Sequence, residues 1–330
     1  MSKPLVLPWA RPLWQRLVSQ HQQSKLPHAI LLSGHIGIGK SEFAHAFAHL
    51  LLCHHPVDQK PCGKCRSCEL VRGGTHPDLV CIHPEEQSKV IKVDQVRELM
   101  SFLHTTSQQG GYRVVVMEPA ESMNISAANA LLKSLEEPGD NTLLLLVSHL
   151  PGQLMPTIRS RCQKVTFPFP DHAIATAWLA EELSLSNDRA EQLLSISQGA
   201  PLKAKNLYQH DLISLRASFM KSLGDLLKAR VTAVTVAEKL YKEDLLQLLD
   251  WTCSILTDLA RLQADARMLN INNKDMQKML SAVSKKANAI EVFNLLDQVQ
   301  SERLNLLQRH NPNRQLLLEG ILLGWVRLVR

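Results

Sequence analysis

Residues 30–41 of the chain read ILLSGHIGIGKS, and this stretch decides the fold class. A short apolar run leads into a turn that contains three glycines, and residues 42–52 then place apolar side chains at helical spacing. From Gly34 to Ser41 the residues match the pattern G-x-x-x-x-G-K-S. A strand before the glycines and a helix after them is the context that a phosphate-binding loop requires.

The residue types of this loop suit a nucleotide phosphate. Gly34, Gly37 and Gly39 permit a tight turn that brings backbone N–H groups close to phosphate oxygens. Lys40 would reach the outer phosphates, and the hydroxyl of Ser41 would help to hold Mg²⁺. The positive end of the following helix adds to the field. We therefore predict a site for ATP or ADP with Mg²⁺; the alternative is a glycine turn that matches the pattern by chance.

Length and composition describe an ordinary globular protein. The 330 residues are enough for two or three domains, with 45% hydrophobic and 21% charged residues. The net charge of +6 permits contact with nucleic acid but does not argue for it, because no segment forms a basic arm. No apolar run approaches the roughly 20 residues of a membrane span, and the first residues do not form a signal peptide. These features predict a cytoplasmic protein.

Four of the seven cysteines form a cluster in the sequence, at Cys53, Cys62, Cys65 and Cys68. In a reducing compartment such a cluster predicts a metal site rather than disulfides. Four thiolates suit tetrahedral Zn²⁺ and leave no open position, so the predicted role is structural. The alternative is a set of buried or unpaired thiols. The remaining cysteines are expected to pack as small apolar residues, and they are Cys81, Cys162 and Cys253.

The order of strands and helices predicts an α/β part followed by a helical part. Apolar strands alternate with helices up to residue 168, as in a parallel sheet that helices flank. The run Pro168-Phe169-Pro170 marks a boundary, and no strand pattern follows it. We expect an α/β domain at residues 1–168 with the cysteine module at 53–68. A small helical domain at 169–209 and a larger one at 210–330 are expected to follow.

Several motifs of residues 28–168 resemble those of the AAA+ clamp-loader family. They are the phosphate loop, the strand that ends at Glu118, residues 126–138 with the sequence SAANALLKSLEEP, and Ser160-Arg161-Cys162. The cysteine insert directly after the phosphate-loop helix is similar to that of bacterial clamp loaders. The resemblance implies an AAA+ sheet domain, a helical lid at 169–209 and a helical collar at 210–330 that serves oligomerisation.

The resemblance also implies partners and a role for one arginine. Clamp loaders are pentameric arcs, here with the gamma/tau and delta subunits of DNA polymerase III, that place a sliding clamp on primer-template DNA at replication forks. Arg161 matches the arginine that one subunit supplies to the ATP of its neighbour. A guanidinium supplied in trans stabilises charge that develops on the γ-phosphate. The alternative for Arg161 is an ordinary ion pair at a helix end.

The chain departs from a motor subunit at the end of the strand before residue 118. Glu118 falls at the position that organises Mg²⁺, but Pro119 stands where the family has its catalytic glutamate. Proline has no carboxylate and cannot act as a base. Ser148 falls at the polar sensor position on the next strand, and Leu202 stands where many relatives have a phosphate-sensing arginine. We therefore expect a subunit that can hold nucleotide but hydrolyses it poorly or not at all.

Three functions follow from this reading. The first is a non-motor subunit of the polymerase III holoenzyme, a nucleotidyltransferase complex, which supplies Arg161 to a neighbouring ATPase. The second is an active motor ATPase, which the phosphate loop supports and Pro119 opposes. The third and weakest is a zinc-dependent DNA-binding module, with Lys60, Lys64 and Arg66 among its basic residues. The lack of interleaved aromatic residues argues against it.

Overall fold

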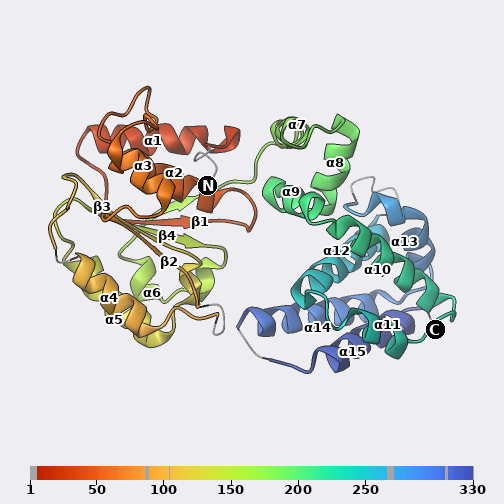
Figure 1. The fold of residues 1–330 in the computed structure, drawn as a ribbon. Helices are drawn as coiled ribbons and strands as arrows, with labels where there is room; N and C mark the ends of the chain where they lie inside the picture. The colour runs from red at the N-terminus through yellow and green to blue at the C-terminus, as the bar shows by residue number, and fades with distance from the viewer. Residues whose placement is uncertain (1–5, 86–88, 104, 266–270, 309–310, 330) are drawn as a thin grey trace. The chain divides into compact units, whose positions relative to one another are not determined.

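The structure is a computed structural model that describes residues 6–85, 89–103, 105–265, 271–308 and 311–329. The chain forms two compact units (Figure 1). The first contains residues 1–190 and 199–203, and the second contains residues 191–198 and 204–330. None of the helices in the described ranges is long and apolar enough to cross a membrane.

A parallel sheet of five strands forms the centre of the first unit, in the order β2-β3-β4-β1-β5. Every residue of β1, β3 and β4 is buried, because helices cover both faces of the sheet. The register places Ser33 at the end of β1 beside Ser148 at the end of β4. The strands are β1 (Ala29–Ser33), β2 (Leu79–Ile82), β3 (Arg113–Met117), β4 (Thr142–Ser148) and β5 (Gln163–Thr166).

Helices lie on both sides of this sheet (Figure 1). One side carries α1 (Arg11–Gln22), α2 (Lys40–Leu52) and α3 (Arg66–Gly73), and the other carries α4 (Val93–Leu103), α5 (Ile125–Glu136) and α6 (Pro156–Arg159). The core between the sheet and the helices α4 and α5 includes Leu31, Met117, Leu131 and Leu146. The remaining elements of this unit are the short helices η1 (Pro8–Ala10), η2 (Ala120–Ser122) and η3 (Pro151–Gln153), and α7 (His172–Leu183).

The second unit is built from helices, and the described residues after β5 contain no strand. Its core is one apolar cluster that includes Phe219, Trp251, Leu280 and Trp325. Two short helices, α8 (Asn187–Ile196) and α9 (Pro201–Gln209), contribute residues to both units. The others are α10 (Leu212–Leu227), α11 (Ala233–Leu240), α12 (Leu245–Ala264), η4 (Lys274–Met276), α13 (Gln277–Ser284), α14 (Ala289–Leu307) and α15 (Arg314–Arg327). The predicted fold class, α/β followed by all-α, is confirmed.

A buried polar cluster joins α12 to the residues around η4. The Asp258 side chain is fully buried and accepts hydrogen bonds from the backbone N–H groups of Asn272 (3.1 Å) and Asn273 (2.8 Å). The amide of Asn273 also donates to Asp258, at 2.8 Å. These bonds hold the segment before η4 against α12, since a buried carboxylate requires donors from its surroundings.

Candidate nucleotide site, cysteine cluster and arginine

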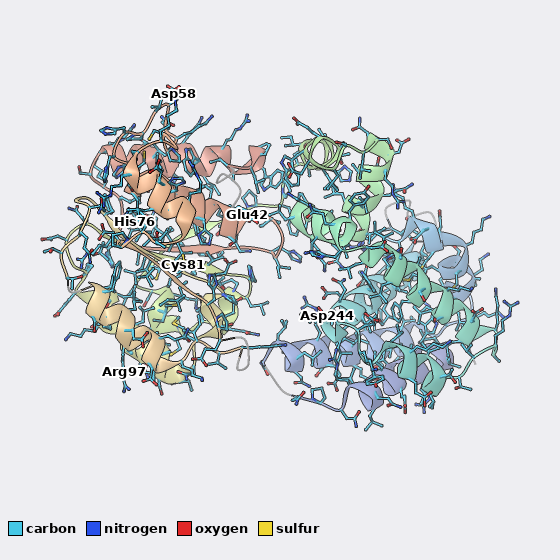
Figure 2. The ribbon with its side chains drawn as sticks, viewed as in Figure 1. Glu42, Asp58, His76, Cys81, Arg97 and Asp244 are labelled. Carbon is cyan, nitrogen blue, oxygen red and sulfur yellow. The ribbon has the colours of Figure 1, made fainter. Side chains whose placement is uncertain are left out.

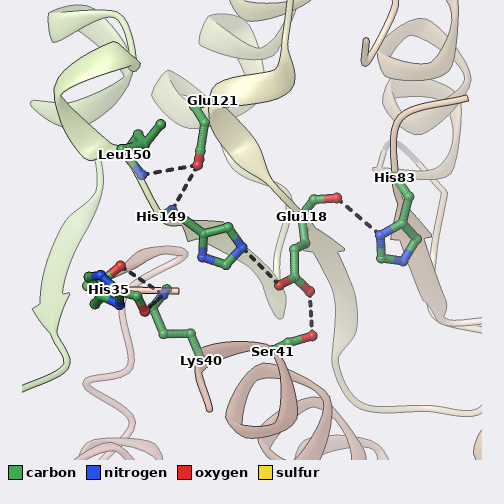
Figure 3. Close-up of polar contacts among 9 residues, drawn as sticks. His35, Lys40, Ser41, His83, Glu118, Glu121, His149 and Leu150 are labelled. Atoms are coloured by element: carbon green, nitrogen blue, oxygen red, sulfur yellow. Dashed lines mark hydrogen bonds and ion pairs between the residues drawn. The ribbon is translucent and has the colours of Figure 1, made fainter. Parts of the chain in front are cut away.

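Three strands bring the predicted nucleotide-site residues to one edge of the sheet. Gly34 follows β1, Glu118 follows β3 and Ser148 ends β4. Since these strands are parallel neighbours, their carboxyl ends meet at the same edge, and Lys40 and Ser41 at the start of α2 lie there as well (Figure 3). The structure thus assembles residues that are more than 100 positions apart in the sequence.

The turn of the phosphate loop is held from outside by other segments of the first unit. Gly39 has a φ of +96°, and a Cβ atom there would lie 2.1 Å from Cδ1 of Leu7, so both backbone and space demand glycine. The indole N–H of Trp9 donates to the carbonyl of Ile38 at 2.8 Å. The backbone N–H of Leu202, the residue at the expected arginine position, donates to the carbonyl of Gly37 at 3.0 Å.

Lys40 lies inside the loop, with only 2% of its surface exposed. Its ammonium group donates to the backbone carbonyl of Gly34, at 2.8 Å, and to that of His35 (Figure 3). Burial lowers the pKa of Lys40 to about 8, although the nearby carboxylates of Glu118 and Glu121 act in the opposite direction. The positive charge expected to meet phosphate is therefore present at neutral pH.

Glu118 lies between Ser41 and a histidine. The hydroxyl of Ser41 donates to Oε2 of Glu118, and Nε2 of His149 lies 3.7 Å from Oε1 (Figure 3). Burial raises the pKa of Glu118, and the hydrogen bond from Ser41 opposes this shift. Burial also lowers the pKa of His149 to about 4, so its imidazole is neutral at pH 7. A hydroxyl and a carboxylate are the hard oxygen ligands that suit Mg²⁺.

The other carboxylate near this edge, Glu121, is bound to the backbone. Its Oε1 accepts the N–H groups of His149 (2.9 Å) and Leu150 (3.1 Å), directly after β4 (Figure 3). His149 was not among the residues predicted for this site, although its place directly after Ser148 was an available signal. The hydroxyl of Ser148 is buried, and within the described part of the chain it has no hydrogen-bond partner.

The four clustered cysteines come together in space. All four Sγ atoms lie within 4.8 Å of one another, with 4.0 Å between those of Cys53 and Cys65 and 3.8 Å between those of Cys62 and Cys68. Tetrahedral Zn²⁺ with Zn–S bonds of about 2.3 Å separates its sulfur ligands by about 3.8 Å. Backbone N–H groups of Lys64 and Cys65 lower the pKa of Cys62 to about 6, which favours the thiolate. The cluster could therefore hold a metal ion.

A chain of buried hydrogen bonds fastens this cysteine module to the sheet domain. Ser67, fully buried in α3, donates its hydroxyl hydrogen to the carbonyl of Leu52 at the end of α2. Its oxygen lies 2.9 Å from Nε2 of His76, and Nδ1 of His76 is 3.0 Å from the backbone N–H of Asp78. Figure 2 labels His76 beside the sheet and Asp58 in the loop between Cys53 and Cys62.

The expectation for the three isolated cysteines is wrong in one case. Cys162 is buried and Cys253 is partly buried, but Cys81 is exposed. It lies on β2, the strand at one edge of the sheet, while its neighbour Ile82 is buried in the core. Alternate residues of a strand point to opposite faces of the sheet, so Cys81 and Ile82 point in opposite directions. Because β2 is an edge strand, it has a neighbouring strand on one side only.

Arg161 lies at the edge of the sheet where the strands begin, and the phosphate loop lies at the edge where they end. It follows α6 and comes two residues before β5 begins, at the edge where the parallel strands start. The strands of this sheet span about 13 to 20 Å between the edge where they begin and the edge where they end. The Arg161 guanidinium forms an ion pair with Glu136 at 2.6 Å and donates to the carbonyl of Thr157 at 3.1 Å. The structure therefore does not bring Arg161 together with the other predicted site residues of its own chain.

Comparison with known proteins identifies the family of the chain. Residues 9–171 match the profile of the family described as DNA polymerase III, delta subunit, and residues 210–327 match that of its C-terminal part. The delta′ subunit of DNA polymerase III from Pseudomonas aeruginosa is 40% identical over 324 residues, which cover 98% of each chain. The chain belongs to the delta′ family of DNA polymerase III subunits. The Escherichia coli member is 31% identical and covers 96% of this chain and 94% of its own.

The solved structures that match the chain are more distant in sequence. A gamma-subunit-related protein of DNA polymerase III from Thermotoga maritima is 19% identical, with a TM-score of 0.41, and the match covers 98% of this chain and 100% of that one. The Thermotoga maritima RuvB branch-migration motor is 14% identical, with a TM-score of 0.43 and coverage of 71% and 81%. The polymerase III family predicted from the sequence motifs is confirmed by the curated relatives.

Proposed function

We propose that this delta′ family member is a non-motor subunit of the polymerase III clamp loader. It assembles with the gamma/tau and delta subunits and supplies Arg161 to the ATP bound by a neighbouring subunit. The complex then places the sliding clamp on primer-template DNA during replication. The chain itself contributes no polymerase activity and little or no ATPase activity.

The observation that carries this proposal is the position of Arg161. Its guanidinium lies at the edge where the strands begin, whereas the phosphate loop follows the end of β1 at the other edge. An arginine in this place is remote from a phosphate held by its own chain, and its exposed side chain is available to a phosphate held by a neighbour. A guanidinium that meets the γ-phosphate of a neighbour stabilises the charge of the transition state.

The nucleotide site of the chain itself supports binding without turnover. The N–H groups after Gly34, the ammonium of Lys40 and the hydroxyl of Ser41 would hold the phosphates, with Ser41 and Glu118 beside Mg²⁺. Glu118 is followed by Pro119, and Glu121 accepts two backbone N–H groups. Pro119 has no carboxylate, and the backbone N–H groups on Oε1 hold Glu121 against the residues that follow β4, so we expect no general base at the position that activates water.

The cysteine module is proposed to hold structural Zn²⁺. Four sulfur ligands at tetrahedral spacing complete the coordination of the ion and leave no place for a substrate. The ion would join the end of α2 to α3, since Cys53 follows α2 and Cys68 lies in α3. This role requires no contact between the module and DNA.

The test is Arg161→Ala in the reconstituted clamp loader. We expect the ATPase rate of the complex, with clamp and primed DNA present, to fall by the part of the rate that the ATP site of the neighbouring subunit contributes. Assembly of the complex is expected to be unchanged. Arg159→Ala is a matched control, because Arg159 is an exposed arginine at the end of α6. An unchanged rate of ATP hydrolysis and clamp loading in the Arg161 variant would exclude the proposed role.

A second measurement separates this function from that of a motor. The intact phosphate loop favours a motor, so the purified chain is assayed for ATP hydrolysis beside its Lys40→Ala variant. We expect background rates from both proteins. Turnover by the unsubstituted chain that the Lys40 substitution abolishes would establish a motor ATPase instead.

A further inference from the structure

Two acidic residues lie at the carboxyl end of α5, where negative charge destabilises a helix. Glu136 is its last residue and Glu137 is the residue that caps it. The carboxyl end of a helix already carries partial negative charge from its unpaired carbonyl groups, so acidic side chains there are locally unfavourable. A local rule that is broken in this way points to a compensating partner elsewhere in the fold.

The partner of Glu136 is Arg161. Oε1 of Glu136 lies 2.6 Å from Nη2 of Arg161, and Nη1 of the same guanidinium donates to the carbonyl of Thr157 at 3.1 Å. The group is thus held through both of its terminal nitrogens, one by α5 and one by α6. A guanidinium has five N–H donors, so these two contacts leave three for a phosphate. The Arg161 side chain remains 36% exposed and can be reached from outside.

We propose that Glu136 is the positioning residue for Arg161. This inference rests on the proposed function, in which Arg161 serves the ATP of a neighbouring subunit. A long arginine side chain samples many rotamers, and a phosphate contact requires one of them. The carboxylate of Glu136 and the carbonyl of Thr157 restrict the guanidinium before the neighbour arrives, which raises the fraction of Arg161 in the productive orientation.

The size of the effect follows from the exposure of the pair. Glu136 is 52% exposed and Arg161 is 36% exposed, and the coupling of exposed ion pairs corresponds to about a two- to fivefold change in an equilibrium. The relevant quantity is the Arg161-dependent ATPase rate, which is the rate of the wild-type complex minus that of the Arg161→Ala complex. We expect Glu136→Ala to lower the kcat of the Arg161-dependent ATPase rate by about two- to fivefold and to leave its KM unchanged.

The experiment uses the complete clamp loader with clamp and primed DNA. Glu136→Asp, which keeps the charge, is expected to retain more of the rate than Glu136→Gln. Glu137→Ala removes the same charge from the same helix end at an exposed position and is expected to behave as the wild type. In the Arg161→Ala background, Glu136→Ala is expected to have no further effect, because Glu136 acts only through the arginine.

The outcomes separate this inference from the function on which it rests. If Arg161→Ala lowers the rate and Glu136→Ala leaves it unchanged or raises it, Glu136 is not a positioning residue and the role of Arg161 stands. If Arg161→Ala has no effect, both fall together. A loss of rate that Glu137→Ala shares, or that persists without Arg161, assigns the effect to helix stability and overturns the inference. Size-exclusion chromatography of each complex confirms that assembly is intact.

Discussion

Replacement of Ser67 by alanine is expected to destabilise the first unit by about 2 to 4 kcal/mol. Nδ1 of His76 accepts the backbone N–H of Asp78, so the ring proton resides on Nε2 and is donated to the Ser67 oxygen. The hydroxyl hydrogen of Ser67 is then free to bind the carbonyl of Leu52. One side chain therefore satisfies a donor on one segment and an acceptor on another.

The magnitude follows from the groups that alanine leaves behind. The carbonyl of Leu52 and the N–H of His76 both lose a partner in a place where Ser67 has no exposed surface. A buried polar group without a partner costs about 1 to 3 kcal/mol, and alanine keeps the Cβ atom, so loss of packing adds little. For a unit of this size the melting temperature should fall by about 4 to 16 °C.

The assay is thermal unfolding together with amide hydrogen exchange. Exchange over residues 66–82 reports on the first unit alone, so the second unit does not obscure the result. Ser160→Ala is the matched control in the same unit, because the exposed Ser160 hydroxyl donates to the nearby carbonyl of Thr157 at 3.1 Å. A loss of stability in the Ser67 variant no larger than that of the control would refute the hydrogen-bond chain described above.

Four further predictions concern the metal site, the nucleotide site, the helical unit and acid stability. If the cluster holds zinc as proposed, elemental analysis is expected to find about one zinc per chain in Cys81→Ser, which lies outside the cluster, and a loss of zinc in Cys68→Ser. Burial lowers the pKa of Lys40 to about 8, so the free protein loses this charge above pH 8; nucleotide affinity in a fluorescence titration should fall there by up to about tenfold per pH unit. Asp258→Ala removes the acceptor of the Asn272 and Asn273 backbone N–H groups and one acceptor of the Asn273 amide, and it is expected to lower the unfolding free energy of the helical unit by about 2 to 4 kcal/mol in urea. Burial lowers the pKa of His76, so on acidification the imidazole of the unfolded chain is protonated before that of the folded chain. The free energy of unfolding therefore falls as the pH drops through about 6.5, and melting curves of His76→Asn should show a smaller acid dependence.

Local sequence patterns were sufficient for the elements and their types. Apolar strands alternating with helices up to residue 168 predicted a parallel sheet, and the pattern from Gly34 to Ser41 predicted the turn between β1 and α2. These signals are reliable because strand and helix periodicity, glycine conformation and thiol spacing are local properties of the chain. The expected boundaries at 1–168, 169–209 and 210–330 stay predictions, and they include residues outside the described ranges.

The contacts of the site could not be predicted in the same way. Nothing near His149 in the sequence shows that its ring lies 3.7 Å from Glu118, and the exposure of Cys81 depends on β2 being an edge strand. The pair of Glu136 with Arg161 likewise joins two separate segments. Each of these facts depends on strand order and on side-chain direction, which are set by packing between distant segments.

The division between local and global information has a physical basis in this protein. The glycines, lysine and thiols carry their chemistry wherever the chain places them, so their spacing alone predicts a phosphate loop and a metal cluster. Whether an arginine faces the loop of its own chain or that of another depends on which edge of the sheet it occupies. Parallel pairing of β1 with β5 places Arg161 and Gly34 at opposite edges, and such pairing forms only when the whole sheet is assembled.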